Sequence, residues 1–211
     1  MYRPPQYREK RIDVMHALIA AHPFAALVTV GEHGLDANHI PFVLHPDEGP
    51  NGTLRGHVSR ANPLWKTVDP KTEALVIFQG PDAYVTPSWY PSKKVDGKVV
   101  PTWVYAAVHA HGPLKVVDDP AAIRQHLDCL VGSQEQDRPA PWYASDAPDD
   151  YIANLIRGIV GIEVPISRLE GKWKLNQDKP EDNRTGTARG LRLEGGPAEQ
   201  ALADLVDNKG A

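Results

Sequence analysis

Short runs in which apolar and polar residues alternate make up most of the chain, and glycine, proline and aspartate separate the runs. This pattern is typical of β-strands joined by tight turns. It predicts strands at residues 24–30, 35–44, 53–59, 74–79, 83–89, 99–110, 114–117 and 159–169. Many short strands at regular spacing favour a barrel or a sandwich. Pro41 lies inside one of these runs, which indicates an edge strand or a bulge at that point.

Helices are expected at the margins of this β structure. Apolar residues recur at helical spacing in four segments, at residues 8–21, 118–131, 148–157 and 197–206. The second segment starts with an aspartate cap followed by a proline, which is a favoured way to begin a helix. Residues 132–145 are polar and rich in proline and are expected to form a loop. We find no internal repeat, so residues 1–211 are expected to form a single, mainly β domain with a helix near each end.

Composition narrows the class of protein. No run approaches the roughly 18 apolar residues that a membrane helix needs, and the first residues lack an apolar signal core, so the cytoplasm is the expected location. The formal net charge is −4, and such a chain lacks the basicity that supplies most non-specific affinity for nucleic acid. Any site for a polyanion is therefore expected to be local. The single cysteine, Cys129, excludes an internal disulfide and is expected to be an inert core thiol.

A candidate anion site follows the strand predicted at 53–59. Ser59, Arg60 and Asn62 bring a hydroxyl, a guanidinium and an amide to a strand end with free backbone N–H groups, and such donors suit a phosphate. The alternative is that Ser59 or Asn62 caps a turn while Arg60 and Lys66 face water. Neither a dinucleotide-binding glycine motif nor a P-loop is present.

A candidate ring-binding site lies in the segment SWYPSKKVDGKVVPTWVY, residues 88–105. Its aromatic residues offer flat faces to a planar ring, and its lysines and a threonine can meet the polar rim of that ring. These residues are Trp89, Tyr90, Trp103 and Tyr105, with Lys93, Lys94 and Thr102. The alternative is a subunit contact, since exposed aromatics and prolines also suit an interface. Asp96-Gly97 within the segment predicts either a hairpin turn or a longer loop.

A metal site is not expected. His109 and His111 share one face of a predicted strand, which is ligand-like spacing, but no third or fourth ligand stands out near them.

Several motifs together carry a resemblance to a known family. They are His39-Ile-Pro-Phe42, Gly56-His-Val-Ser-Arg-Ala-Asn-Pro-Leu-Trp65, Ile77-Phe-Gln-Gly80, Tyr84-Val-Thr-Pro-Ser-Trp-Tyr-Pro-Ser-Lys93, Val100-Pro-Thr-Trp-Val-Tyr105 with Val108-His109, and Lys174-Leu-Asn-Gln177. With these motifs in this order, the chain resembles the PaiB family of FMN-binding split-barrel proteins, which are often described as negative transcriptional regulators. It departs from the usual family pattern at Val104, where asparagine is expected, and at Asn176, where serine is commoner.

The resemblance implies a six-stranded split β-barrel of the pyridoxamine-phosphate-oxidase-like kind. It also implies a homodimer with two FMN sites at the subunit interface. By matching motif, His57, Ser59, Arg60 and Asn62 would meet the phosphate and the ribityl chain. Residues of the segment from Trp89 to Trp103 would border the ring from either subunit, namely Trp89, Tyr90, Lys93, Thr102 and Trp103. Gln79 and Lys174 are further candidates for cofactor contacts.

Two functions follow from this resemblance. The first is a flavoprotein with a regulatory role, although the acidic balance and the lack of a convincing helix-turn-helix do not support direct reading of DNA. The second is an enzyme, an FMN-dependent oxidoreductase, because FMN carries hydride and one-electron chemistry that the protein positions and tunes. A haem-binding or haem-degrading split barrel is a variant of the second. The spacing of the residues identifies no catalytic acid–base pair.

Overall fold

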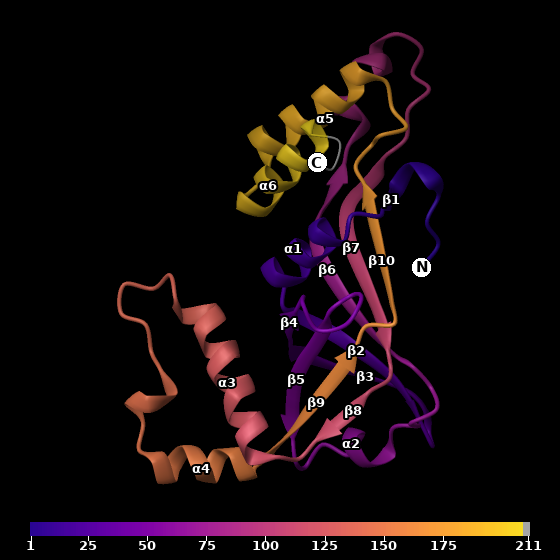
Figure 1. Cartoon of the computed structure of the whole chain (residues 1–211). Helices are drawn as coiled ribbons and strands as arrows, with labels where there is room; N and C mark the ends of the chain where they lie inside the picture. The colour runs from indigo at the N-terminus through magenta and orange to yellow at the C-terminus, as the bar shows by residue number, and fades with distance from the viewer. Residues whose placement is uncertain (209–211) are drawn as a thin grey trace. The chain divides into compact units, whose positions relative to one another are not determined.

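The structure, a computed structural model, describes residues 1–208 (Figure 1). The chain divides into two compact units, each assembled from segments that lie far apart in the sequence. Unit 1 comprises Met1–Leu18, Gln79–Val108 and the described residues from Glu170 onward. Unit 2 comprises Ile19–Phe78 and His109–Leu169. Neither unit is a single continuous segment of the chain. The single domain over residues 1–211 stays a prediction.

The described residues form ten strands and six α-helices, with short 3₁₀ turns between them. The strands are β1 Arg8–Glu9, β2 Phe24–Gly31, β3 Gly34–Pro41, β4 Val43–His45, β5 Thr53–Ser59, β6 Ala74–Val85, β7 Thr102–Gly112, β8 Lys115–Val117, β9 Ile159–Pro165 and β10 Arg168–Lys174. The helices are α1 Ile12–Ala21, α2 Leu64–Thr67, α3 Pro120–Glu135, α4 Asp149–Arg157, α5 Glu181–Glu194 and α6 Pro197–Asp207. Two 3₁₀ turns, Pro87–Trp89 and Pro91–Lys94, lie in the aromatic segment.

Unit 2 is built on antiparallel strands. One sheet has the strand order β4-β5-β9-β8, and β5 pairs with β9 along its whole length, from Thr53 opposite Pro165 to Ser59 opposite Ile159. Strand β2 pairs with β3 on one side and with the first part of β6 on the other. Inward-facing residues alternate with outward-facing ones along β2, as the sequence pattern predicts. The rings of Phe42 and Phe78 meet edge to face in the core of this unit.

Helices α3 and α4 bury their apolar stripes in unit 2. Ile123 of α3 packs with Ile152 and Ile156 of α4 in one buried cluster. The carboxylate of Asp119 accepts hydrogen bonds from the backbone N–H groups of Ala121 and Ala122, so the predicted aspartate cap is confirmed. The helix continues to Glu135, into the segment that was expected to be a loop. This extension is polar, and no apolar stripe marks it in the sequence.

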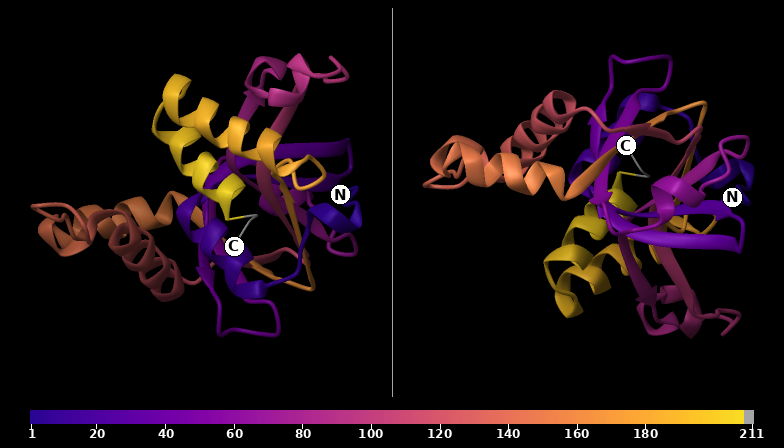
Figure 2. Two further views of the ribbon diagram at one scale, coloured as in Figure 1. Left: turned by 90° about the horizontal axis from the view of Figure 1, so that it is seen from above. Right: turned by 90° about the horizontal axis from the view of Figure 1, so that it is seen from below.

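Unit 1 combines strands with the helix pair α5 and α6. Strand β1 pairs antiparallel with β10, with Arg8 opposite Lys172. Helices α5 and α6 lie side by side in both views of Figure 2 and share a buried core that includes Leu191, Leu202 and Val206. Arg192 of α5 also forms ion pairs with Asp204 and Asp207 of α6. Helix α5 was not predicted, because its sequence EDNRTGTARGLRLE lacks an apolar stripe.

Three predicted strand boundaries are wrong. The run at 35–44 is divided at Phe42 into β3 and β4, which belong to different sheets, and Pro41 ends an edge strand as expected. The run at 159–169 is likewise two strands, β9 and β10. The strands predicted at 74–79 and 83–89 are one strand, β6, which ends at Val85 and has no turn at Gly80. A Cβ at Gly80 would lie 2.9 Å from the Leu18 side chain and 3.1 Å from the Ala106 carbonyl oxygen, so this glycine allows close packing instead of a turn.

Other expectations have mixed outcomes. Residues 95–101 form a loop without paired strands, so the longer-loop alternative for Asp96-Gly97 is correct. Cys129 is exposed, and the expectation of a core thiol is wrong, because Ile123 and His126 are the buried residues of α3. Among the described residues, no helix is both long enough and apolar enough to span a membrane.

Candidate functional site

A groove in unit 1 gathers three aromatic side chains from two of the predicted motifs. It has a volume of about 420 Å³ and is lined by Tyr84, Trp89 and Trp103 together with Asp82, Ala83, Leu191, Glu194, Gly195 and Glu199. The rings of Tyr84 and Trp103 meet edge to face with their centroids 6.3 Å apart. Both residues are half exposed, at 50% for Tyr84 and 53% for Trp103. The groove therefore offers aromatic surface to a ligand.

Helix α5 fixes the position of Trp89. A Cβ at Gly190 would overlap the indole ring, and a Cβ at Gly186 would overlap the Trp89 carbonyl oxygen. The two glycines are four residues apart and thus share one face of α5. Farther along the helix, the Glu194 carboxylate accepts a hydrogen bond of 2.8 Å from Nε1 of Trp89. The indole is consequently held from behind before any ligand arrives.

A buried polar network anchors the rest of the aromatic segment. The Asn176 amide donates hydrogen bonds to the Tyr90 hydroxyl and to Thr187 of α5. The Asn183 amide bonds both the backbone N–H and the hydroxyl of Ser92. Asn176 adopts a φ of 60°, a left-handed conformation that asparagine tolerates better than serine does. The departure from the family pattern at Asn176 therefore supplies both the backbone conformation and the two hydrogen bonds.

Tyr90 belongs to this network and not to the groove. Only 2% of the residue is exposed, and burial raises the pKa of its hydroxyl above the usual value. Val104 is also fully buried, on the face of β7 opposite Trp103. The valine at this position, where the family pattern has asparagine, thus leaves the exposed face that carries Trp103 unchanged.

The polar edge of the groove is acidic. Asp82, Glu194 and Glu199 line it, and Gln79, an exposed residue of β6, donates a hydrogen bond of 2.8 Å to Asp82. Glu199 accepts a hydrogen bond from the backbone N–H of Gly196 at the start of α6. These carboxylates suit hydrogen-bond donors on a ligand and repel a phosphate.

The remaining predicted residues of unit 1 form two polar pairs. The exposed Lys93 donates a hydrogen bond of 3.1 Å from Nζ to the hydroxyl of Ser88, the residue before Trp89. Nζ of Lys174 on β10 lies 2.6 Å from the hydroxyl of Thr102 at the start of β7. Lys93 therefore bonds the residue that precedes the groove residue Trp89, and the second pair joins two strands of unit 1.

The predicted anion loop lies in unit 2, after β5, and its arginine is already bonded to other groups of the protein. The Arg60 guanidinium contacts both carboxylate oxygens of Asp118, at 2.5 and 3.0 Å, and donates to the backbone carbonyls of Arg157 and Ile159. The Arg60 guanidinium holds the pKa of Asp118 below its usual value, chiefly through the hydrogen bonds. Two parallel hydrogen bonds join the guanidinium to the carboxylate, and another oxyanion, such as a phosphate, can bind a guanidinium in the same way.

The neighbours of Arg60 bond mainly to one another. Ser59 accepts a hydrogen bond from the backbone N–H of Ala61, and Asn62 accepts one from the N–H of Leu64 while its amide donates to Asn38. Trp65 donates from Nε1 to the carbonyl oxygen of Arg60. Ser59 and Asn62 thus cap a turn, as the alternative predicts, but Arg60 pairs with Asp118 and does not simply face water.

His57 lies beneath α3. Its Nδ1 is 3.1 Å from Nε2 of His126, and their rings meet edge to face. Burial lowers the pKa of both imidazoles, and that of His126 to about 4, with the charges of His57, His45 and Arg55 adding to the burial. Both rings are therefore neutral at pH 7. His57 is a structural neighbour of the loop, and the contact with His126 accounts for its position.

The structure thus gathers Gln79, Trp89 and Trp103 at the groove of unit 1 and Ser59, Arg60 and Asn62 at the loop of unit 2. Tyr84, Glu194 and the glycines of α5 were missed from the sequence. The spacing of Gly186 and Gly190 is the one signal that points to a close approach of α5 to another group.

Comparison with known proteins identifies the class. The sequence model of the family described as "Putative FMN-binding domain" matches residues 1–168. An uncharacterized protein of Aspergillus fumigatus is 32% identical, over 100% of this chain and 98% of its own length. The protease synthase and sporulation protein PAI 2 of Bacillus subtilis is 25% identical, over 99% of this chain and 98% of its own length.

Two solved structures share the fold. The flavocytochrome Anf3 from Azotobacter vinelandii superposes with a TM-score of 0.60 at 15% identity, over 86% of this chain and 77% of that one. The FAD and heme binding protein from Mycobacterium smegmatis gives 0.58 at 16% identity, over 84% and 78%. The predicted fold class, a mainly β split barrel with peripheral helices, is confirmed.

These matches define a flavin-binding split-barrel protein. The chain belongs to the FMN-binding family that includes the PaiB-type proteins, and FMN is the cofactor of this family. The predicted family and the predicted cofactor are therefore confirmed.

Proposed function

We propose that this chain is a flavoprotein that holds the ring system of FMN in the groove of Tyr84, Trp89 and Trp103. The observation that carries the proposal is the half-exposed pair Tyr84 and Trp103 beside a tryptophan that α5 holds in place. Rigid aromatic surface of this kind suits a planar ring, and the carboxylates at the edge suit its N–H groups. FMN supplies hydride and one-electron transfer when bound. The side chains of the groove bind and orient it.

The phosphate of the cofactor requires a different environment, because the groove is acidic. Arg60 fits that requirement, as the resemblance predicts. We assign the phosphate to the place of the Asp118 carboxylate on Arg60, since both are oxyanions that a guanidinium binds through two parallel hydrogen bonds. Ser59 adds a hydroxyl that can donate to the same anion, and the amide of Asn62 keeps the loop in shape.

The homodimer belongs to the same proposal. The resemblance implies that residues of both subunits border each flavin, so the groove and the loop need not come from the same chain. Sedimentation or light scattering is expected to give twice the 23.2 kDa of one chain. A molecule that stays at 23.2 kDa at all concentrations would contradict this part.

The regulatory role is proposed as indirect and cytoplasmic. The net charge of −4 disfavours direct association with DNA, so a promoter fragment is expected not to shift even at low salt. The alternative, an FMN-dependent oxidoreductase or a haem protein, is supported by the half-exposed side chains of Tyr84 and Trp103, which a second reactant can approach. Steady consumption of a nicotinamide donor in the presence of FMN would support the enzyme, and a Soret band after haem addition would support the haem variant.

The groove is tested by FMN titration of two tryptophan variants. Trp103→Ala is expected to weaken FMN binding about tenfold, the effect of losing one stacking partner. Trp142→Ala is the matched control, since Trp142 is an exposed tryptophan of unit 2 outside the groove, and it is expected to bind as the parent does. Equal affinities in the two variants would exclude the groove. A parent protein that binds no FMN would exclude the function.

A further inference from the structure

A second cavity lies in unit 2, beneath α3. It has a volume of about 130 Å³, and α3 contributes Ile123, His126 and Cys129 to its wall. The facing wall comes from β4, β5, β8 and β9 and includes His45, Gly161 and Ile162. None of the groove residues of unit 1 lines it. An apolar cavity of about 150 Å³ holds a molecule of benzene, so this volume suits one small ring.

Two imidazole nitrogens of this wall have no hydrogen-bond partner among the described residues. They are Nδ1 of His126, whose residue is 95% buried, and Nε2 of His45. Nε2 of His126 is engaged by His57, so Nδ1 is the nitrogen that remains for another partner. A buried polar atom of this kind is costly unless a hydrogen bond satisfies it. The cavity therefore has two imidazole nitrogens without partners. The rest of its wall combines the apolar side chains of Val117, Ile123 and Ile162 with the polar side chains of Arg55, Gln125 and Glu163.

The neighbours of His45 determine the kind of hydrogen bond it makes. Its Nδ1 lies 3.6 Å from the Glu48 carboxylate, which accepts hydrogen bonds and cannot donate them when ionised. Burial lowers the pKa of His45, so the ring is neutral at pH 7 and carries one proton. The carboxylate favours that proton on Nδ1, which leaves Nε2 as an acceptor. An occupant must therefore offer a donor to His45.

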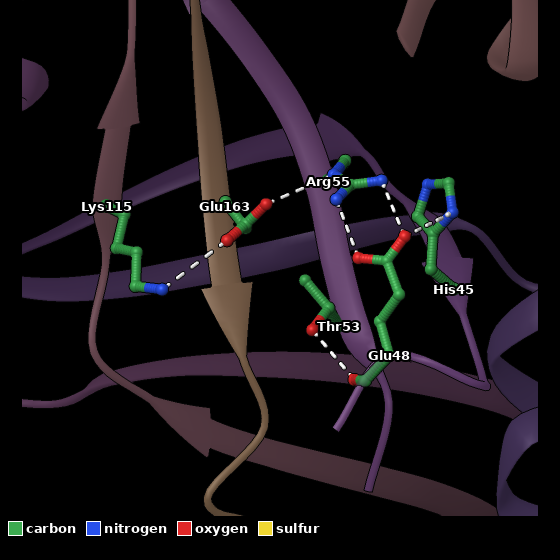
Figure 3. A network of polar contacts seen from close by, with 6 residues as sticks. All are labelled: His45, Glu48, Thr53, Arg55, Lys115 and Glu163. Atoms are coloured by element: carbon green, nitrogen blue, oxygen red, sulfur yellow. Dashed lines mark hydrogen bonds and ion pairs between the residues drawn. The ribbon is translucent and has the colours of Figure 1, made fainter. Parts of the chain in front are cut away.

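The charges beside the cavity cancel one another. Figure 3 shows Arg55 between Glu48 and Glu163, with Lys115 on the other side of Glu163. Arg55 lies 2.6 Å from the Glu48 carboxylate and 3.1 Å from that of Glu163, and Lys115 lies 3.6 Å from Glu163. Two cations thus face two carboxylates. A charged occupant gains no net attraction from this set and loses its hydration on entry. An uncharged molecule avoids that cost.

We propose that the cavity beneath α3 is a binding site for a small uncharged ring that carries an N–H or O–H donor. The donor bonds Nε2 of His45, the ring packs on Ile123 and Ile162, and His126 offers a second polar contact through Nδ1. Because α3 forms one wall, the occupant stabilises the packing of this helix on the sheet. The site is separate from the flavin groove and adds a ligand that FMN binding does not require.

Pyrrole and furan provide a matched pair of probes. Both are uncharged five-membered rings, but pyrrole donates an N–H and furan does not. Titration of the ¹⁵N-labelled protein at pH 7 is expected to shift the amides of Gly56, Gly161 and Ile123 saturably with pyrrole. Furan is expected to bind about tenfold more weakly, the effect of one hydrogen bond to a buried acceptor. Equal affinities, or the lack of any saturable shift with pyrrole, would overturn the proposal.

A histidine variant assigns the acceptor. His45→Phe keeps a ring but lacks the nitrogen, and it is expected to lower the affinity for pyrrole to that for furan while FMN binding stays unchanged. His33→Phe is the control, because His33 is an exposed histidine of the β2–β3 turn. If His45→Phe loses its dispersed amide spectrum, the ratio of the two affinities in the parent protein still decides the matter. Zn²⁺ that shifts the same amides while pyrrole does not would replace this site with a metal site.

Discussion

The groove of unit 1 and the loop of unit 2 both derive from motifs that predict cofactor contacts, yet their side chains are used in opposite ways. In the loop, Arg60 directs its donors to Asp118 and to two backbone carbonyls, and Asn62 closes on its own neighbours. In the groove, the hydrogen bonds lie behind the aromatic residues and leave the face of Trp103 open. A side chain is available to a ligand only where the folded protein leaves its polar atoms without a hydrogen-bond partner or its ring exposed.

The difference extends to what each site needs before a ligand binds. The groove is held ready by glycines and by a buried amide network, so binding requires little rearrangement. The loop must give up an existing ion pair before it accepts a phosphate. Preorganised contacts contribute more to affinity than contacts that first have to break. We therefore expect the groove to dominate the affinity for FMN.

The largest effect is expected from removing the preorganisation of the groove. In Gly190→Ala the new Cβ overlaps the Trp89 ring, so either the indole or α5 must move. We expect the free energy of unfolding to fall by about 3 kcal/mol, the upper range for overpacking. FMN binding is expected to weaken with it. Urea unfolding and an FMN titration measure the two effects.

Gly132→Ala is the matched control for that variant. Gly132 lies in α3, and a Cβ there meets nothing within 4 Å. Alanine has the higher helix propensity, so this change is expected to raise the free energy of unfolding by about 0.5–1 kcal/mol. If both variants were equally stable, the close contact between α5 and Trp89 would be refuted.

Much of unit 2 could be predicted from the sequence because its strands have local signals. Strand β5 has the predicted bounds, since alternation and flanking turns mark it at both ends. Helix α5 had no such signal. Its buried residues include asparagine, threonine and glycine as well as alanine and leucine. They contact Trp89 and Asn176, which are distant in the sequence, so no local pattern predicts them.

The sequence predicts which residues lie near the candidate site, but it does not predict which of them are free to contact a ligand. Trp89 and Trp103 were expected near the ring, and they line the groove. Tyr90, next in the chain to Trp89, is buried because Asn176 lies 86 residues away in sequence and bonds its hydroxyl. Arg60 is paired with Asp118, which is 58 residues away. Partners at such separations decide which polar groups remain free, and a single sequence does not contain them.

Lowering the pH is expected to destabilise unit 2, which contains the buried His126. The pKa of His126 falls from 6.5 to about 4 in the folded chain, so the unfolded chain binds more protons between pH 6.5 and pH 4. Stability is therefore lost as the pH falls through that window, at up to about 1.4 kcal/mol per pH unit and about 3 kcal/mol near pH 4. Urea unfolding at pH 7, 5.5 and 4.5 measures the loss.

His126→Phe separates this effect from the general titration of carboxylates. The variant keeps a buried ring on α3 and removes the group that must stay neutral. Its stability is expected to decline less steeply between pH 6.5 and 4 than that of the parent, whatever its stability at pH 7. Parallel curves for the two proteins would mean that His126 does not couple acid to unfolding.

The buried network of unit 1 is expected to matter somewhat less. Asn176→Ala leaves the Tyr90 hydroxyl without its amide donor, and it places alanine at a φ of 60°. We expect the free energy of unfolding to fall by about 2–3 kcal/mol. Asn176→Gly loses the same hydrogen bonds without the backbone strain and is expected to recover about 1 kcal/mol of that loss. If the two variants were equally stable, the left-handed backbone would not contribute.

The smallest effect is expected at the loop, where Asp118→Asn tests whether a phosphate competes for Arg60. The amide binds a guanidinium less strongly than a carboxylate does, so Arg60 becomes available. FMN binding is expected to tighten about threefold, while the affinity for riboflavin, which has no phosphate, stays the same. Arg60→Ala is expected to weaken FMN binding and again to spare riboflavin. If instead both variants weaken the two flavins alike, the ion pair only shapes the loop and the phosphate binds elsewhere.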